Sequence, residues 1–234
     1  MNKKFTKEDL LPFCADPEKE LLRKWIQEPW VNEKTGDVWA SEGHYSLILK
    51  RSLVSGRLKK YHYGNNINIP QADMHATIKF SDIDAAYDKA EKYPEAITVP
   101  TGEIIECEDC NGTGEVTWEY EDLDGNTHDL IDTCPVCDGD GTVVEKTVKL
   151  TGKMLVKPDQ LFKLHNTFFN IDNMMRVVDG LKKLGFTKFV RLNEGLCGAS
   201  LFEVAEGVTL LLMPIIGDGN TARKIINIKI SKEQ

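Results

Sequence analysis

The sequence predicts an α+β fold in which helices pack on antiparallel sheets, with a small cysteine-rich module inserted into it. Apolar residues recur at helical spacing near both ends of the chain, and runs rich in β-branched and aromatic residues follow them. Between these parts, residues 103–147 are rich in Cys, Gly, Asp and Glu and hold few large apolar residues. We therefore expect one body formed by residues 1–102 and 148–234, interrupted by a module at 103–147.

The composition is typical of a globular protein. Hydrophobic residues make up 41% of the 234 positions, and a chain of this length can bury a sizeable core. No run approaches the roughly 18 uninterrupted apolar residues of a membrane helix, and the first residues lack the apolar segment of a secretion signal. We expect a cytoplasmic protein with no membrane partner. The 29 basic and 37 acidic residues give a net charge of −8, so no global field attracts nucleic acid.

Helix signals open the chain. Thr6 followed by Asp9 resembles a capping box, which predicts a helix start. Asp16-Pro17 then places a cap before a proline suited to a first helical turn, and Pro29 ends the apolar periodicity that follows. The residues that predict this second helix are Leu21, Leu22, Trp25 and Ile26.

Strand signals follow. Val38–Leu49 is rich in aromatic and β-branched residues, which predicts two strand pieces around a turn at Glu42-Gly43. Ser81, with Asp84 three residues later, predicts the start of a short helix that runs to about Ala90.

The last third of the chain again contains apolar residues in patterns that are typical of core-forming helices and strands. Lys157-Pro158-Asp159 predicts the start of one helix, and a second helix is expected from about Asn170 to Leu184, where Gly185 would form the C-terminal cap. Its apolar stripe consists of Ile171, Met174, Met175, Val178, Leu181 and Leu184. The strands expected after it are Lys188–Leu192, Leu201–Val204 and Val208–Met213.

Four of the six cysteines predict a metal site. Cys107, Cys110, Cys134 and Cys137 form two Cys-x-x-Cys pairs. Two intervening residues let both sulfurs of a pair face one point, and two pairs complete the tetrahedron of a closed, structural zinc site. We expect one structural Zn²⁺ ion, with a disulfide or redox pair as the alternative.

A hairpin is expected between the two cysteine pairs. Asp124-Gly125 is a strong turn signal between the strand-like segments 115–120 and 128–133, so the hairpin would bring the second pair beside the first. His128 is expected near its tip as a surface residue and not as a ligand. The remaining cysteines, Cys14 and Cys197, lie in apolar surroundings and are expected to be buried reduced thiols.

The cysteine segments Cys107–Gly114 and Cys134–Gly141 both read Cys-x-x-Cys-x-Gly-x-Gly. This pattern resembles the zinc-binding region of DnaJ-type co-chaperones, which normally has four such repeats and two zinc ions. Here there are two repeats, and the chain has no His-Pro-Asp signature of a J-domain. The resemblance implies a zinc hairpin that contacts unfolded or extended polypeptide.

Three other segments resemble bacterial sliding clamps, the beta subunit of DNA polymerase III. Val38–Leu49 is similar to a strand–turn–strand of the clamp, with Ser41 and Glu42 in place of the Thr and Asp of the family. Gly207–Pro214 looks like the closing clamp strand, and Tyr93–Pro100 like the segment between half-domains. The resemblance implies a clamp-like domain and a role in DNA replication. However, the chain offers material for about one such domain, where a ring-forming protomer needs two or three.

The basic stretch from Arg51 to Tyr63 is the candidate nucleic-acid surface, and its alternative interpretation is a solvated strand end or loop. The cationic residues on which this hypothesis depends are Arg51, Arg57, Lys59 and Lys60.

Two functions follow from these patterns. The first is a non-enzymatic zinc-binding accessory protein of DNA replication or repair, from a phage or mobile element, with DNA as a candidate partner. The alternative is a zinc-hairpin protein-interaction or chaperone-like module with no nucleic-acid role, whose partner is a protein or an extended polypeptide. No catalytic residue is predicted, because the sequence has no nucleophile elbow, phosphate loop or His-Glu-x-x-His motif.

Overall fold

The computed structural model describes residues 4–62, 69–193, 198–215 and 224–230. The chain divides into two compact units: unit 1, Met1–Lys92 with Val156–Gln234, and unit 2, Tyr93–Leu155. Unit 2 contains the module expected at 103–147 and also residues 93–102 and 148–155. These flanks belong to unit 2 because they form the two strands of its ribbon and pair with each other.

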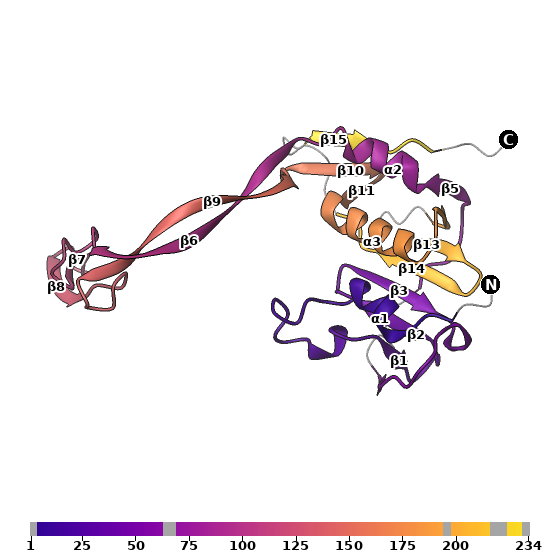
Figure 1. Cartoon of the computed structure of the whole chain (residues 1–234), viewed down its shortest axis with the longest axis horizontal. Helices are drawn as coiled ribbons and strands as arrows, with labels where there is room; N and C mark the ends of the chain where they lie inside the picture. The colour runs from indigo at the N-terminus through magenta and orange to yellow at the C-terminus, as the bar shows by residue number, and fades with distance from the viewer. Residues whose placement is uncertain (1–3, 63–68, 194–197, 216–223, 231–234) are drawn as a thin grey trace. The chain divides into compact units, whose positions relative to one another are not determined.

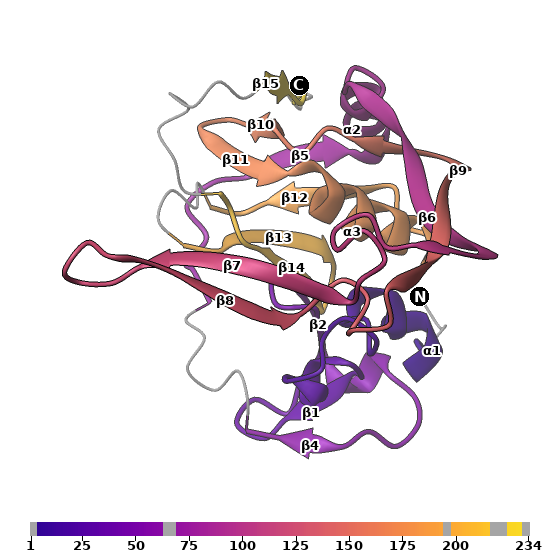
Figure 2. The same ribbon diagram turned by 90° about the vertical axis from the view of Figure 1, so that its left-hand side faces the viewer.

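Unit 1 is built on an eight-stranded sheet with the order β4-β1-β2-β3-β14-β13-β12-β5 (Figures 1 and 2). Its pairs are antiparallel except for β1 with β4, which are parallel. The strands are β1 (Trp30–Asn32), β2 (Val38–Ser41), β3 (Tyr45–Leu49), β4 (Lys60–Tyr61), β5 (Ala76–Lys79), β12 (Lys188–Arg191), β13 (Ser200–Ala205) and β14 (Val208–Leu212).

A second sheet of unit 1 has the order β11-β10-β15, in which β10 is antiparallel to β11 and parallel to β15. Its strands are β10 (Gln160–Leu164), β11 (Thr167–Asn170) and β15 (Lys224–Asn227). The helical elements are α1 (Lys7–Leu10), α2 (Phe80–Tyr87) and α3 (Ile171–Lys183), with short 3-10 turns η1 (Leu11–Phe13), η2 (Lys24–Ile26) and η3 (Arg51–Leu53). None of the helices in the described ranges is long and apolar enough to span a membrane. The architecture is α+β, as expected.

Helix α3 packs its apolar face into the main core. The Asn170 side chain accepts a hydrogen bond from Asn173 N at 3.0 Å. Gly185 follows the helix at φ 93°, which confirms the predicted C-terminal cap. Gly180 lets Phe13 lie against the helix, since a Cβ there would stand 2.7 Å from the Phe13 ring. The buried apolar side chains of the helix are Ile171, Met174, Val177, Val178 and Leu181. Burial of each large apolar side chain contributes roughly 1.5–3 kcal/mol, so this face, more than helix propensity, stabilises α3.

Several other predicted elements are confirmed. Thr6 and Asp9 form the capping box of α1, with both reciprocal hydrogen bonds present. Strands β2 and β3 flank the expected turn, and the strands expected in the last third are β12, β13 and β14. In addition, β14 pairs with β3, with Val208 opposite Leu49. Two of the three clamp-like segments therefore lie side by side in one sheet.

The helix expected from residue 17 to Pro29 is wrong. The segment forms a turn and the short η2, and Leu21 and Leu22 are 66% and 89% exposed. A helical stripe forms when a partner surface buries it, but here only Trp25 and Ile26 join an apolar cluster, which also contains Trp30 and Trp39.

Two smaller predictions also need correction. Lys157–Asp159 leads into strand β10, not a helix, because residues after it pair with β11 on one side and β15 on the other. Ser81 lies inside α2, whose N-cap is Lys79 without a side-chain cap, and α2 ends at Tyr87 instead of Ala90.

Unit 2 is a long two-stranded ribbon that carries a shorter hairpin (Figure 1). The ribbon strands β6 (Lys92–Glu106) and β9 (Thr142–Val156) pair with each other. Cross-strand contacts support the pairing: Thr151 Oγ1 lies 2.6 Å from Glu95 Oε2, and Thr101 Oγ1 lies 3.2 Å from the Glu145 carbonyl oxygen. Tyr93–Pro100, which resembles the segment between clamp half-domains, lies within the first ribbon strand.

The shorter hairpin consists of β7 (Glu115–Glu121) and β8 (Thr127–Thr133), which pair antiparallel. Gly125 occupies the turn at φ 82°, where glycine is favoured. The predicted hairpin around Asp124-Gly125 is confirmed.

Candidate metal centre

The structure brings the four predicted cysteines together. Their Sγ atoms all lie within 4.8 Å of one another, and the distances are 3.9 Å for Cys107–Cys134 and 3.8 Å for Cys110–Cys137. Four sulfurs arranged tetrahedrally about 2.3 Å from one ion would be about 3.8 Å apart. A disulfide would need about 2.05 Å, and all four are free cysteines. The arrangement could therefore hold one metal ion.

Main-chain N–H groups support the sulfurs. Gly114 N donates to Cys110 Sγ at 3.3 Å, and Gly141 N donates to Cys137 Sγ at 3.3 Å. These hydrogen bonds favour the negatively charged thiolate form that a metal ion requires. The two repeats therefore support their second cysteines in the same way.

The same glycines lock the two repeats together. Cys107 N donates to the Gly141 carbonyl at 2.9 Å, and Cys134 N donates to the Gly114 carbonyl at 2.8 Å. Both glycines have positive φ, 78° and 69°, and a Cβ on either would lie 2.3 Å from a carbonyl oxygen of the other repeat. A side chain is excluded at both positions by conformation and by space.

Burial and hydrogen bonds act on the thiols in opposite directions. Desolvation raises the pKa of Cys107 to about 12 and also raises the pKa of Cys137. Desolvation opposes ionisation of Cys110 as well, but the Gly114 N–H and the neighbouring thiols outweigh it and lower its pKa to about 7. A metal ion that binds here displaces protons from thiols, so its affinity falls as the pH falls.

We call residues 107–141 the head. It is strongly acidic: residues 104–145 contain no Lys or Arg, and residues 107–141 contain 11 Asp and Glu. Unit 2 as a whole has 15 acidic and 3 basic residues, a net charge of −12, whereas unit 1 has 22 acidic and 26 basic residues, a net charge of +4. The overall charge of −8 is therefore the sum of two net charges of opposite sign, one for each unit.

His128 lies at the end of the hairpin that carries the turn. Its ring stacks on Tyr120 at a centroid distance of 5.3 Å, and its Nε2 is 2.8 Å from Asp122 Oδ2. Hydrogen bonds from His128 and Asn126 hold the pKa of Asp122 down at about 2. These contacts fix the turn of the hairpin.

The predicted nucleic-acid residues fall into two groups. The Arg51 guanidinium donates to the Val54 carbonyl and, at 2.7 Å, to the Gly56 carbonyl, so it holds its own loop. Arg57, Lys59 and Lys60 are exposed, and Lys60 lies in β4 at the edge of the large sheet. The hypothesis of nucleic-acid contact stays a prediction, and these three cations are the ones available for it.

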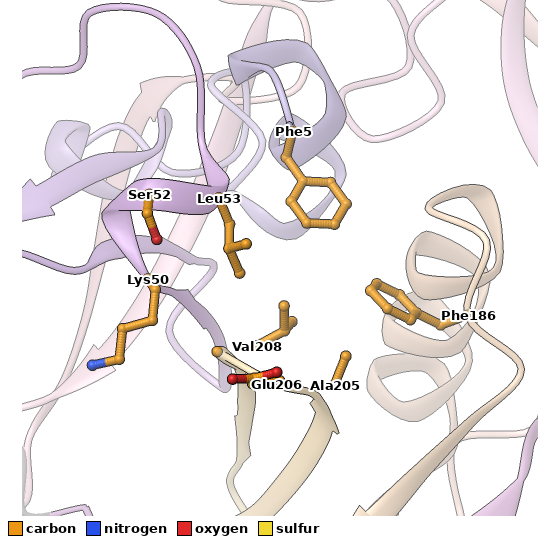
Figure 3. Close-up of a pocket in the computed structure, with 9 residues that line it drawn as sticks. Phe5, Lys50, Ser52, Leu53, Phe186, Ala205, Glu206 and Val208 are labelled. Carbon is orange, nitrogen blue, oxygen red and sulfur yellow. The ribbon is translucent and has the colours of Figure 1, made fainter. Parts of the chain in front are cut away.

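A cavity of about 390 Å³ lies in unit 1, and sequence patterns did not reveal it. Phe5, Leu53, Phe186 and Val208 line it. Figure 3 shows the residues that line it, and the rings of Phe5 and Phe186 are neighbours with centroids 6.2 Å apart. Lys50 stands at its border and pairs with Asp37 at 3.4 Å. Its lining comes from chain segments far apart in sequence, so no local motif could indicate it.

The other two cysteines were expected to be buried. Cys14 is 2% exposed, and burial raises its pKa to about 12, which makes it an unreactive thiol. Cys197 lies outside the described residues.

No protein-family model and no curated protein matches the chain. Solved structures with a similar fold include a DnaN sliding clamp (DNA polymerase III subunit beta) from Bartonella birtlesii bound to griselimycin, with 12% identity and a TM-score of 0.43. Others are the beta sliding clamp of C. crescentus, with 11% identity and a TM-score of 0.41, and DNA polymerase III subunit beta from Borrelia burgdorferi in complex with a natural product, with 10% and 0.42. The matches cover 88–89% of this chain but only 60–62% of those chains. With TM-scores below 0.5, no functional assignment follows from them.

Proposed function

We propose that the chain is a non-enzymatic accessory protein in which one structural Zn²⁺ ion folds the head as a contact surface for another protein. The observation that carries the proposal is the convergence of four buried sulfurs within 4.8 Å of one another.

Zinc suits this donor set. Closed tetrahedral sites of four thiolates are typical of structural Zn²⁺. With four protein ligands the ion keeps no position for water or substrate, and hydrolytic zinc needs such a position. The donor set therefore supports a structural ion over a catalytic one.

The head also lacks another means of folding. Apart from the four cysteines, only Val116 and Val143 pack against its small apolar cluster. A segment of this size rarely folds without a metal ion or disulfides, and metal binding contributes folding free energy directly. The ion thus takes the place of a hydrophobic core.

The charge of the head favours a protein partner over DNA. Phosphate contacts need Lys or Arg, and residues 104–145 have neither. The two Cys-x-x-Cys-x-Gly-x-Gly repeats, which resemble half of the DnaJ-type pattern, also support contact with polypeptide.

A second candidate function is a role in DNA replication or repair, with DNA contacting unit 1. The net charge of +4 on unit 1 and the exposed Arg57, Lys59 and Lys60 favour it, as do the segments that resemble sliding clamps. In this proposal the two units bind different partners: unit 1 contacts DNA, and the head contacts a protein.

Metal analysis of the purified full chain tests the main proposal. We expect one zinc per chain by mass spectrometry of the metal content. Replacement by Co²⁺ should give the absorption bands of a tetrahedral four-thiolate site. A chain that folds its head without metal, or that holds an iron–sulfur cluster instead, would overturn the proposal.

A further inference from the structure

We infer that the head binds an extended, basic polypeptide segment along the β7–β8 hairpin, with alternate side chains of the segment against one face of the hairpin. This inference rests on the proposed function, because the zinc-folded head is what presents that face.

The hairpin has two chemically different faces. Residues directly opposite in an antiparallel pair share a face, and neighbours along a strand alternate. Trp118 pairs with Leu130, Tyr120 with His128 and Val116 with Asp132, so one face is mainly aromatic and apolar. The opposite face carries Glu119 beside Asp129, together with Glu115, Thr117, Glu121, Thr127, Ile131 and Thr133.

The aromatic face is open to solvent. Trp118, Tyr120 and Leu130 keep 52%, 54% and 52% of their surface exposed. Large side chains that are half-exposed and adjacent are typical of contact surfaces. Trp and Tyr also offer contact area at a low cost in side-chain entropy.

A hollow of about 400 Å³ lies beside the metal site at the base of the hairpin, and residues from both faces of the hairpin border it. Val116 and Trp118 line it from the hairpin, and Pro135 and Val136 line it from the second cysteine pair. The carboxylate-bearing Asp109 and Glu115 also border it, as do Cys110, Asn111 and Thr117. The hollow therefore combines apolar walls, which suit an apolar side chain, with acidic residues.

Charge identifies the occupant as basic. The head has 11 carboxylates and no Lys or Arg, and four thiolates around a divalent ion add further negative charge. Such a field attracts a cationic partner and repels an anionic one. Lys or Arg side chains would also stack on Trp118 or Tyr120, where the ring face attracts a cation.

The hairpin also favours an extended partner. β7 and β8 form a sheet of two strands, so the outer edge of each has main-chain groups without a strand partner in unit 2. An added strand would pair with these groups, and its alternate side chains would meet the aromatic face. In a strand where Lys or Arg alternates with apolar residues, one kind of side chain would meet the aromatic face and the other kind the face that carries Glu119 and Asp129.

The test uses the zinc-loaded full chain and a labelled peptide of alternating Lys and Val, long enough to span the seven residues of β7. We expect saturable binding by fluorescence anisotropy that weakens as salt rises. A matched peptide with Glu in place of Lys should bind at least about tenfold more weakly. Equal binding of the two peptides would overturn the inference.

Two neighbouring residues provide the matched variants. Leu130→Ala and Trp118→Ala should weaken binding by about tenfold or more. Ile131→Ala, on the other face and 66% exposed, should leave it within about twofold. Equal losses for Leu130→Ala and Ile131→Ala would overturn the aromatic-face assignment.

Zinc content, measured in every sample, separates the two proposals. If each chain holds one zinc but does not prefer the Lys peptide over the Glu peptide, this inference is overturned, whereas the proposed function is not. Peptide binding that persists in a metal-free chain would count against the structural zinc instead. Binding of a DNA oligonucleotide to the head, or head-dependent self-association in sedimentation, would also overturn the choice of partner.

Discussion

Gly114 donates its main-chain N–H to Cys110 Sγ, and the Gly114 carbonyl accepts the N–H of Cys134, the first cysteine of the other repeat. Gly141 makes the equivalent contacts to Cys137 and Cys107. Each repeat therefore donates a hydrogen bond to the sulfur of its own second cysteine. It also accepts a hydrogen bond from the main-chain N–H of the first cysteine in the other repeat. These reciprocal hydrogen bonds couple the local geometry of the two repeats around the site.

Gly114→Ala should lower the zinc affinity of the chain and the thermal stability of the head. The new Cβ would stand 2.3 Å from the Gly139 carbonyl oxygen, in a residue at φ 78°, and the clash involves main chain that cannot rotate away. Gly125→Ala is the matched control, with φ 82° but its nearest atom at 3.6 Å. The control should cost only the conformational penalty, about 1 kcal/mol. Competition with a chelator and thermal unfolding measure both variants, and equal losses would refute the close-approach argument.

Cys107→Ser and Cys134→Ser should each release zinc and disorder the head. The reason is that the ion supplies the folding free energy of this segment. Hydrogen exchange by mass spectrometry should show fast exchange across residues 107–141 while α3 and β14 stay protected, since unit 1 has its own buried core. Cys14→Ser serves as the control and should leave the zinc content unchanged. Unaltered metal content in Cys107→Ser would contradict the four-cysteine site.

Arg57, Lys59 and Lys60 test the second candidate function. If they bind phosphates, replacing all three with Gln should reduce the slope of log affinity against log salt by about 0.9 for each phosphate that is no longer neutralised. Arg51→Gln should instead loosen the loop that ends at Gly56 and leave that slope unchanged. Binding of duplex DNA at several salt concentrations gives the slopes. An unchanged slope in the triple variant would remove this edge of the sheet from consideration.

Glu91 should make the stability of unit 1 depend on pH. Hydrogen bonds from Lys224 at 2.7 Å and Lys157 at 3.0 Å lower its pKa to about 2. Because the folded-state pKa lies below the unfolded value of about 4.3, the contribution is complete above about pH 4.3 and is lost as the pH falls towards 2. The group is exposed, so the effect is small. Amide exchange in β10 at pH 7 and pH 3 should differ less in Glu91→Gln than in the unaltered chain. Lys224→Gln should give most of the same change.

Gly180→Ala should destabilise α3 despite the better helix propensity of alanine. Propensity would favour alanine by about 1 kcal/mol, but the Cβ would stand 2.7 Å from the Phe13 ring, and overpacking costs about 1–3 kcal/mol. Phe13→Leu should partly relieve the clash, so the double variant should show a coupling free energy. Urea unfolding of the four chains measures it. A stabilised Gly180→Ala chain would show that the Phe13 ring moves aside easily.

Local patterns predicted the elements whose signals lie within one segment. The start near Asn170, the stripe that includes Met174 and Leu181, and Gly185 all belong to one stretch, and α3 formed as expected. The cysteine pairs and Asp124-Gly125 are equally local. Leu21 and Leu22 show the limit of such signals, because a stripe at helical spacing forms a helix only when another surface buries it, and here both side chains stay exposed.

The sequence by itself determined the α+β class, the four-sulfur donor set and the charge of each segment, because these depend on residue types and short spacings. Only the tertiary structure decided that β14 pairs with β3, that β10 lies between β11 and β15, and that the residues lining the hollow beside Cys110 come together. It also showed that the Arg51 guanidinium is hydrogen-bonded to its own loop, whereas the cations after it are exposed. The Arg51 contacts are local, to Val54 and Gly56, but no sequence signal marks them. The strand pairings depend on contacts between segments far apart in the chain, and the free energy of such contacts is not encoded in any one segment.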